Sequence, residues 1–378
     1  MGFKTMTMRR FAIFLPIFLL ACTHAQKMDI EQLHLPPAFH IRIFAQAGAQ
    51  ANDPRMMAFS PGGVLLASNP DDGKVYAFPD PKHTGQAERV AEVVGGLREP
   101  HGIAFHDGKL YVAENHQIQR FDWDESQLRA SNGKVIAQLP GGRGHSSRTI
   151  LFANGKLYAS AGSTCNVCIE EDSRRATVME FNEDGSGMKI FARGLRNSVG
   201  LALNPKTKTI WATENERDML GDNIPPDEIN DLGVGGDFGW PYCYGRQVPD
   251  REYTKPGDER CAKTIPPKVE LQAHSAPLGL AFYEGTMFPV GYRGDLFVAL
   301  HGSWNRSVPT GYKVVRVHIN EKGEPAGVED FITGWIKPGE TKKGVRMGRP
   351  VGIVFSSDGS MYLSDDEAGV IYRVTWER

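Results

Sequence analysis

The 378-residue chain lacks the features of several common protein classes. Its charges nearly cancel, with 43 Lys and Arg against 45 Asp and Glu, so a broad basic surface for nucleic acid is not expected. The apolar run at residues 11–21 is too short to cross a bilayer as a helix. Long stretches with helical periodicity are missing as well. These absences argue against nucleic acid as a partner and against a helical fold.

The N-terminus has the pattern of an export signal. Lys4, Arg9 and Arg10 precede the apolar run, as in a signal peptide. The run ends in LLAC, which resembles a bacterial lipoprotein cleavage site with Cys22 as the lipidated first residue. We therefore predict a lipoprotein-type signal peptide at residues 1–21, export to the periplasmic side and a membrane anchor of acyl chains on Cys22. An ordinary secretory signal with an incidental cysteine is the alternative.

Four cysteines remain beyond the N-terminal region. An even number in an exported chain indicates two disulfides, and the spacing favours Cys165 with Cys168 and Cys243 with Cys261 among three pairings. The CxxC could instead be a redox pair or half of a zinc site. No helical pattern follows Cys168, and zinc would need two more ligands nearby, so disulfides are preferred. Ile169 follows Cys168, so the CxxCH haem motif is absent.

One sequence pattern recurs six times along the chain. Each copy has apolar, β-prone residues on both sides of a turn, which predicts a hairpin, and several copies are followed by a further strand. The copies begin at Met56, His101, Arg148, Val199, Leu278 and Val351. Their spacing fits four-stranded blades with loop insertions. We predict an all-β fold, a single six-bladed β-propeller of four-stranded antiparallel blades over residues 30–378.

The proposed ring needs a way to close. Residues 37–44 read as a strand before the first copy, and we expect this strand to complete the blade that ends in residues 370–376. Propellers bind ligands at the axial channel, where the loops before the innermost strands converge. The residues just before each copy are therefore the candidates for a functional site.

A histidine stands at two of these positions. His145 lies three residues before the third copy, in a glycine-rich segment. An imidazole there can take the proton of a substrate hydroxyl, because its pKa lies near working pH. His101 begins the second copy and is a competitor for the role of base. A packing or surface role is the alternative for either residue.

Arginines stand at four of the six positions. They are Arg55, Arg148, Arg196 and Arg349. So many converging cations would repel one another unless a polyanionic ligand lies among them. For Arg196, which is followed by Asn197, a salt bridge to Glu214 or Asp218 is the alternative.

The segment ENERDMLGDNIPPDE, residues 214–228, is rich in carboxylates. Hard cations such as calcium take six to eight oxygen ligands, including carbonyls of irregular loops. The spacing of an EF-hand is missing. The loop is thus a candidate calcium site, with a solvated acidic loop as the alternative.

Several longer motifs together carry a family resemblance. The stretches GHSSRTILF, GKLYASAGSTCNVC, GLRNSVGLALNP, NERDMLGD, GDFGWPYCYG and LHGSWNRSVPTGYKVVRV resemble the glucose/sorbosone dehydrogenases that use pyrroloquinoline quinone (PQQ), above all the L-sorbosone dehydrogenase-like branch. The resemblance implies PQQ and Ca²⁺ as cofactors. It also implies oxidation of an aldose or sorbosone-like sugar by hydride transfer to the quinone, with electrons passing to an external quinone or cytochrome. The alternatives are a calcium-dependent lactonase and a non-catalytic sugar-binding propeller.

The resemblance also implies roles for single residues. His145 would be the general base, and Arg196 with Asn197 would face the C5 oxygen of PQQ. Gly144 stands where the glucose enzymes carry an aspartate. The candidates for binding the PQQ carboxylates are Arg55, Arg148, Arg306, Lys313 and Arg349. The candidate metal ligands are the carbonyls of Glu216 and Arg217, to which charge adds Asp218.

Overall fold

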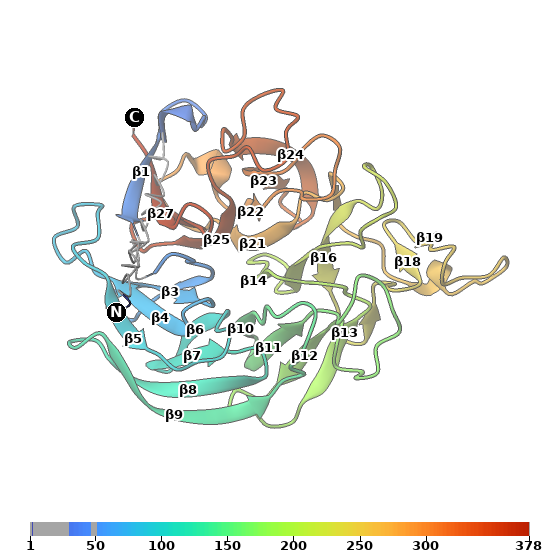
Figure 1. The fold of residues 1–378 in the computed structure, drawn as a ribbon, viewed down its shortest axis with the longest axis horizontal. Helices are drawn as coiled ribbons and strands as arrows, with labels where there is room; N and C mark the ends of the chain where they lie inside the picture. Colours follow the sequence, from blue (N-terminus) through green and yellow to red (C-terminus); the bar gives the residue numbers. More distant parts are fainter. Residues whose placement is uncertain (1, 3–29, 47–50, 378) are drawn as a thin grey trace.

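The computed structural model describes Gly2, residues 30–46 and residues 51–377. The predicted signal peptide and Cys22 lie outside these residues, apart from Gly2. Six β-sheets form a ring (Figure 1), which confirms the predicted six-bladed propeller. No helix in the described part of the chain is long and apolar enough to cross a membrane.

In the first three blades the strands follow one another outward from the axis. The first blade contains β2 (Met57–Phe59), β3 (Leu65–Asn69), β4 (Lys74–Phe78) and β5 (Ala91–Val94). The second contains β6 (Ile103–His106), β7 (Lys109–Ala113), β8 (Gln117–Asp124) and β9 (Arg129–Gln138). The third contains β10 (Ile150–Ala153), β11 (Lys156–Ala161), β12 (Thr177–Phe181), β13 (Lys189–Arg193) and the short β17 (Gly236–Asp237).

The last three blades repeat this order. The fourth contains β14 (Leu201–Leu203), β15 (Ile210–Glu214), β16 (Asp227–Leu232) and β20 (Val269–Leu271). The fifth contains β21 (Pro277–Phe282), β22 (Leu296–Leu300), β23 (Lys313–Ile319) and β24 (Pro325–Ile332). The sixth contains β25 (Pro350–Phe355), β26 (Met361–Asp365), β27 (Val370–Trp376) and, from the other end of the chain, β1 (Phe39–Gln46).

The third blade departs from the predicted four antiparallel strands. The long connection between β16 and β20 folds back, and its strand β17 pairs with β13 in parallel. The same connection holds the hairpin of β18 (Cys243–Tyr244) and β19 (Val248–Pro249), which the Cys243–Cys261 disulfide ties to the short helix η3 (Cys261–Lys263). Two other short helices are η1 (Ile30–Gln32) and η4 (Val290–Tyr292). The predicted pairing of Cys243 with Cys261 is confirmed.

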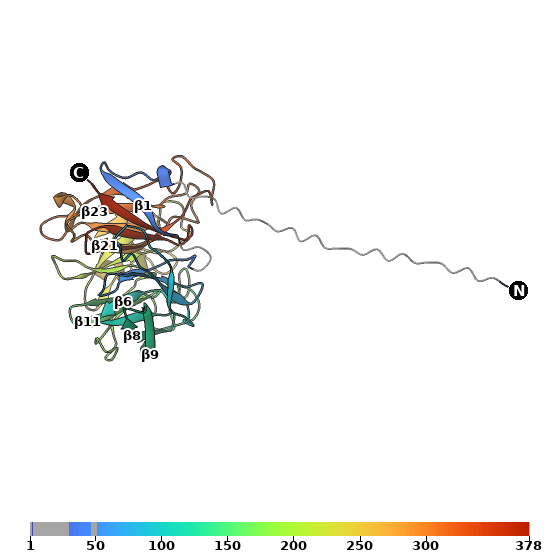
Figure 2. The same cartoon turned by 90° about the vertical axis from the view of Figure 1, so that its left-hand side faces the viewer.

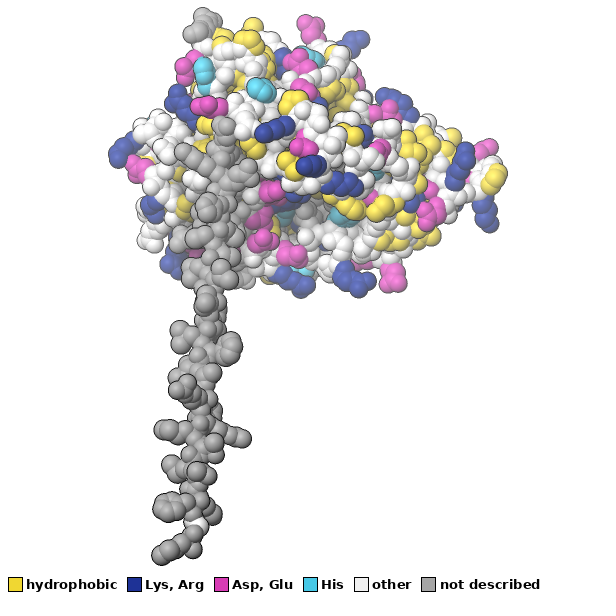
Figure 3. Space-filling model, turned by 45° about the horizontal axis from the view of Figure 1, so that its top comes forward, with side chains coloured by type: hydrophobic (Ala, Val, Ile, Leu, Met, Phe, Trp, Pro, Cys, Tyr) yellow, Lys and Arg dark blue, Asp and Glu magenta, His cyan; other side chains and the backbone are white. Residues whose placement is uncertain are grey.

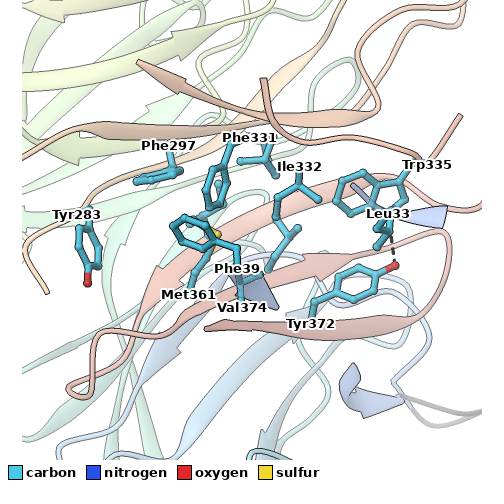
Figure 4. Packing of buried hydrophobic residues seen from close by; sticks show 14 of the residues in the cluster. Leu33, Phe39, Tyr283, Phe297, Phe331, Ile332, Trp335, Met361, Tyr372 and Val374 are labelled. Atoms are coloured by element: carbon cyan, nitrogen blue, oxygen red, sulfur yellow. Dashed lines mark hydrogen bonds between the residues drawn. The ribbon is translucent and has the colours of Figure 1, made fainter. Parts of the chain in front are cut away.

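The ring closes as the sequence predicted. β1 pairs antiparallel with β27, from Phe39 opposite Trp376 to Gln46 opposite Val370. β1 and β9 both lie at the periphery of the ring (Figures 1 and 2). Phe39 contacts the edge of Phe331 at 5.0 Å between ring centroids, inside the aromatic cluster of Figure 4. The two ends of the chain therefore share one hydrophobic core.

The innermost strands approach one another closely at the axis. A Cβ on Gly200 would lie 2.2 Å from the carbonyl oxygen of Leu278 in the next blade, so only glycine fits there. Just before the inner strands or at their starts, Met56, Val199, Leu278 and Val351 form a buried apolar cluster. We call this cluster the axial layer. It lies between a large channel cavity of about 730 Å³, lined by the inner strands, and the loops that precede those strands.

The closure predicts a mutational effect on stability. Phe39→Ala should lower the free energy of unfolding by about 3–5 kcal/mol, because it leaves a cavity in the core that joins the two chain ends. Urea denaturation measures this loss. Val328→Ala on β24, where the side chain is 45% exposed, is the control and should change stability by less than about 1 kcal/mol. Equal effects of the two variants would contradict the closure.

Candidate active site

A polar cavity of about 210 Å³ lies over the axial layer, where the loops before the inner strands converge. Its charged and polar lining includes Arg55, His145, Arg196, Asn197, Asp218, Asp227, His274, His301, Asn305 and Arg349. The larger channel cavity is lined mainly by apolar side chains of the inner strands. The smaller cavity is therefore the candidate active site, and we call it the site cavity.

His145 is held with one ring nitrogen engaged. Its Nδ1 lies 3.1 Å from the carbonyl oxygen of Ser163 and 3.0 Å from the Ser163 hydroxyl. Because a carbonyl only accepts, Nδ1 carries the proton and Nε2 keeps a free lone pair. Burial, and then the charge of Arg196, lowers the pKa of His145 to about 3. A Cβ at Gly144 would lie 2.4 Å from Thr164, so Ser163 orients this histidine and a side chain at 144 cannot.

Arg196 is enclosed by acceptors. Its guanidinium donates to the carbonyls of Asn166, Asn215 and Glu216 at 2.8, 3.0 and 2.9 Å. It also donates to the Asp218 carboxylate at 2.9 Å. The salt bridge considered as an alternative is thus present, and Arg196 lines the site cavity at the same time.

Arg349 differs from the other two arginines of the site cavity. Arg55 pairs with Asp366, which also binds Nε2 of His301. Arg349 donates only to two carbonyls, those of His301 at 3.0 Å and Gly302 at 2.8 Å. No carboxylate within the described residues forms an ion pair with it. Arg349 therefore carries a positive charge that no direct ion pair neutralises.

Three predicted cofactor-binding residues do not line the site cavity. Arg148 is fully buried and donates to the carbonyls of Pro140, His145 and Ser147. Arg306 donates to carbonyls of the acidic loop and its neighbours, including Asp222 and Ala273. Lys313 pairs with Asp330 at 2.6 Å on the outer part of its blade. Arg148 and Arg306 hold the surrounding loops in place, a role that sequence position alone does not reveal.

The other histidine candidate lies beside the site cavity. His101 is buried, and its Nδ1 lies 3.3 Å from the Thr149 hydroxyl. It lines a neighbouring cavity of about 230 Å³, which shares Arg55 and Ser147 with the site cavity. Burial holds the pKa of His101 well below its ordinary value. Of the two candidates, only His145 lines the site cavity itself.

Two of the three predicted calcium ligands already accept hydrogen bonds from protein donors. The Glu216 carbonyl accepts from Arg196, and the Asp218 carboxylate accepts from Arg196 and from Asn305 Nδ2 at 2.6 Å. The Arg217 side chain pairs with Asp250 and with Glu252. Calcium at these atoms would have to displace Arg196.

Buried acids surround this loop. Burial raises the pKa of Glu216 to about 7 and that of Asp227 to about 6. Burial also raises the pKa of Glu214, whose carboxylate accepts from the Asn197 amide and the Ser198 hydroxyl, both at 2.6 Å. The two ends of the segment are therefore internal to the protein, whereas its middle, which includes Met219 and Ile224, is exposed.

The CxxC forms a disulfide, as predicted. Cys165 and Cys168 are joined, and with Glu170 they are the one group of potential metal ligands close enough together in the part of the chain that the structure describes. Bonded sulfurs offer no thiolate, so a zinc site is excluded there. Ser163 and Asn166 were not among the predicted site residues, because their only sequence signal was their place in the GSTCNVC stretch.

Fold and site together define a six-bladed propeller with cations and a neutral histidine over its axis. The sequence model of the TrAA12-like family matches residues 34–377, and the chain belongs to this family. An uncharacterized protein of Borreliella burgdorferi is 33% identical over 97% of each chain. The PQQ-dependent pyranose dehydrogenase of Coprinopsis cinerea is 27% identical over 72% of this chain, which matches 45% of that enzyme's length.

Solved structures share the fold. The holo form of the PQQ domain of the Coprinopsis cinerea pyranose dehydrogenase aligns with a TM-score of 0.77 over 91% of this chain and 97% of that one, at 23% identity. A calcium structure of a Trichoderma reesei enzyme of family AA12 aligns with a TM-score of 0.78 over 91% and 97%, at 21% identity. At these identities the structural likeness establishes the propeller and no more.

The environment of His145 predicts its titration. In the cofactor-free protein the imidazole should stay neutral well below pH 5, because burial and Arg196 lower its pKa from 6.5 to about 3. Unfolding then takes up a proton, so this histidine makes stability fall as the pH drops below about 6.5. NMR of the histidine ring signals, assigned with His145→Gln, measures the titration. A midpoint near 6.5 would contradict the buried geometry.

Proposed function

We propose that the protein is a PQQ-dependent sugar dehydrogenase. The observation that carries this proposal is the unneutralised Arg349 in one cavity with Arg55, Arg196 and the neutral His145. PQQ is a flat tricarboxylate, and arginine binds carboxylates in a fixed fork geometry. When bound, PQQ would supply the quinone that accepts a hydride. The PQQ-dependent enzymes among the relatives support the same assignment.

The donor set of the site cavity fits this cofactor. Arg349 and Arg55 would hold the carboxylates, and Arg196 with Asn197 would lie along the quinone edge. The amide oxygen of Asn305 is buried with no hydrogen-bond partner among the described residues, so the cavity offers a free acceptor as well as cations. Gly302 permits close packing, because a Cβ there would lie 2.4 Å from the ring of Tyr312.

The chain's own residues provide the proton chemistry. His145 Nε2 would accept the proton of the substrate hydroxyl, with Ser163 holding the ring in the required tautomer. The guanidinium of Arg196 would oppose negative charge that develops near it. The axial layer closes the floor of the site cavity against the channel below. A base and a cation over an apolar floor can take up the proton and stabilise charge, while the hydride acceptor would be the quinone of bound PQQ.

A substrate, an electron acceptor and a metal complete the proposed function. We propose an aldose or sorbosone-like sugar as substrate and a quinone or cytochrome as external electron acceptor. Trp304, 61% exposed at the rim of the site cavity, offers a flat surface to a sugar ring. Calcium is supported by the calcium structure of the Trichoderma relative. The Glu216 carbonyl and the Asp218 carboxylate, proposed as calcium ligands, accept hydrogen bonds from Arg196. We therefore assign calcium no role in the reaction.

The alternatives fit the site less well. A calcium-dependent lactonase would need free, ionised channel carboxylates, whereas Asp218 is paired with Arg196 and burial raises the pKa values of Glu216 and Asp227. A non-catalytic sugar-binding propeller would not need a histidine held in one tautomer with its lone pair free. These contacts favour the dehydrogenase.

Reconstitution tests the proposal. The purified protein should bind PQQ, and with PQQ and Ca²⁺ it should reduce a dye in the presence of one or more aldoses or sorbosone. Arg349→Ala should raise the dissociation constant for PQQ about 10- to 150-fold, since a charge-assisted contact contributes roughly 1.5–3 kcal/mol. His145→Ala should abolish dye reduction while PQQ still binds. Quenching of tryptophan fluorescence measures the binding.

The matched control removes a cation outside the site cavity. Lys313→Ala should leave the PQQ dissociation constant within about twofold of the wild-type value. Failure of the wild-type protein to bind PQQ would refute the proposed function. Equal weakening by Arg349→Ala and Lys313→Ala would refute the role of Arg349.

We also propose export to the periplasmic side with a lipid anchor on Cys22, for which the N-terminal sequence is the support. Cys22→Ala should move the protein from the membrane fraction to the soluble fraction, because the acylated residue is lost. Fractionation of bacteria with radiolabelled palmitate measures both anchoring and lipidation. Label on the Cys22→Ala protein, or an unchanged distribution, would contradict this proposal.

A further inference from the structure

The loop that begins at Ser163 contacts both members of the proposed catalytic pair, His145 and Arg196. The backbone of Ser163 donates to the Arg196 carbonyl at 2.7 Å and accepts from the His145 amide at 2.9 Å. Its side chain and carbonyl also hold His145 Nδ1. The Ser163 hydroxyl in turn donates to the Cys165 carbonyl at 2.6 Å. His145 and Arg196 are therefore held in common through the start of this loop.

Asn166 supplies a second set of contacts. Its carbonyl accepts from Nε of Arg196 at 2.8 Å, and its side-chain oxygen accepts from Nη2 of Arg196 at 3.1 Å. The same side-chain oxygen accepts from the Asp218 amide at 2.8 Å, while the side-chain nitrogen donates to the Asp218 carbonyl at 3.1 Å. Asn166 thus joins Arg196 to the loop at residues 215–218.

The disulfide fixes the backbone that presents Asn166. Cys165 and Cys168 close a loop of four residues around it, and Tyr253 donates to the Val167 carbonyl at 3.0 Å. Glu170 binds the amide and the hydroxyl of Thr164 at 2.6 and 2.8 Å. A disulfide that closes so short a loop restricts the unfolded chain little and therefore adds little to the stability of the whole protein. The effect of this disulfide is therefore expected to be local.

We propose that the loop closed by Cys165 and Cys168 is a positioning device of the active site, with Asn166 as its positioning residue. This loop fixes the position of Arg196 relative to His145 and relative to residues 215–218. The inference deepens the proposed function and rests on it for the roles of His145 and Arg196. The hydrogen bonds themselves do not depend on that function.

The second disulfide provides a contrast. Cys243 and Cys261 are 3% and 2% exposed and tie the hairpin of β18 and β19 to η3, where neither sulfur contacts the catalytic pair. Cys165 and Cys168 are half-buried. The segment that this second disulfide closes also reaches the site loops, since its residues Asp250 and Glu252 pair with Arg217, so it does not serve as a control.

Amide hydrogen exchange of the cofactor-free protein tests the positioning. The Asp218 amide should exchange at least tenfold faster in Asn166→Ala, which removes its acceptor, and in Cys165→Ser/Cys168→Ser. The surface variant Asn182→Ala is the control, and it should not change exchange at residue 218. Unchanged exchange in both test variants would overturn the proposal, as would equal acceleration in the control.

Steady-state kinetics of the PQQ-loaded protein give the second measurement. Asn166→Ala should lower kcat at least tenfold with KM for the sugar changed less than threefold, because a displaced Arg196 affects the reacting geometry rather than sugar binding. An unchanged kcat in Asn166→Ala would overturn the positioning role. If the wild-type protein shows no PQQ-dependent activity, the proposed function fails, while the exchange comparison still decides whether this loop orders residues 215–218.

Discussion

The close approach of six strands at one axis is the constraint on which the site depends. Neighbouring inner strands lie so near each other that Gly102 donates directly to the Arg148 carbonyl of the next blade at 2.8 Å. A Cβ at Gly102 would lie 2.6 Å from that oxygen. The strands can converge only where side chains are absent, and the residues just before them then meet over a common floor. Arg55, His145, Arg196 and Arg349 become neighbours in this way although the chain separates them widely.

The three arginines of the site cavity are not neutralised equally. Asp218 neutralises Arg196, and Asp366 neutralises Arg55. Burial alone would raise the pKa of Asp366, but His301 and Arg55 beside it hold that pKa below its ordinary value. Arg349 has only carbonyl partners. Arg349 is therefore the guanidinium of the site cavity that is left without an ion pair and can bind an anion. On the face of the molecule shown in Figure 3, Lys and Arg side chains are interspersed with Asp and Glu side chains.

The sequence predicted the fold and much of the site for one reason. The hairpin repeat has a period that alternation and turn residues reveal, so six blades, the pairing of β1 with β27 and the residues before each inner strand could be inferred. The direction in which each side chain points could not be inferred from the sequence. Arg148 begins one copy and Arg196 lies three residues before the next, and both are buried and donate to carbonyls, yet only Arg196 lines the site cavity. Asn166 shows the converse, because its importance comes from contacts with residues 30 and 52 positions away. Such contacts leave no local pattern.

A crystal structure of the protein with PQQ would test the central claim, that the cations over the axial layer form the binding site of a carboxylate-bearing redox cofactor. PQQ should lie in the site cavity, with one carboxylate within hydrogen-bond distance of Arg349 and with His145 Nε2 facing the space left for a sugar. PQQ bound elsewhere, or bound in the site cavity without contact to Arg349, would contradict it.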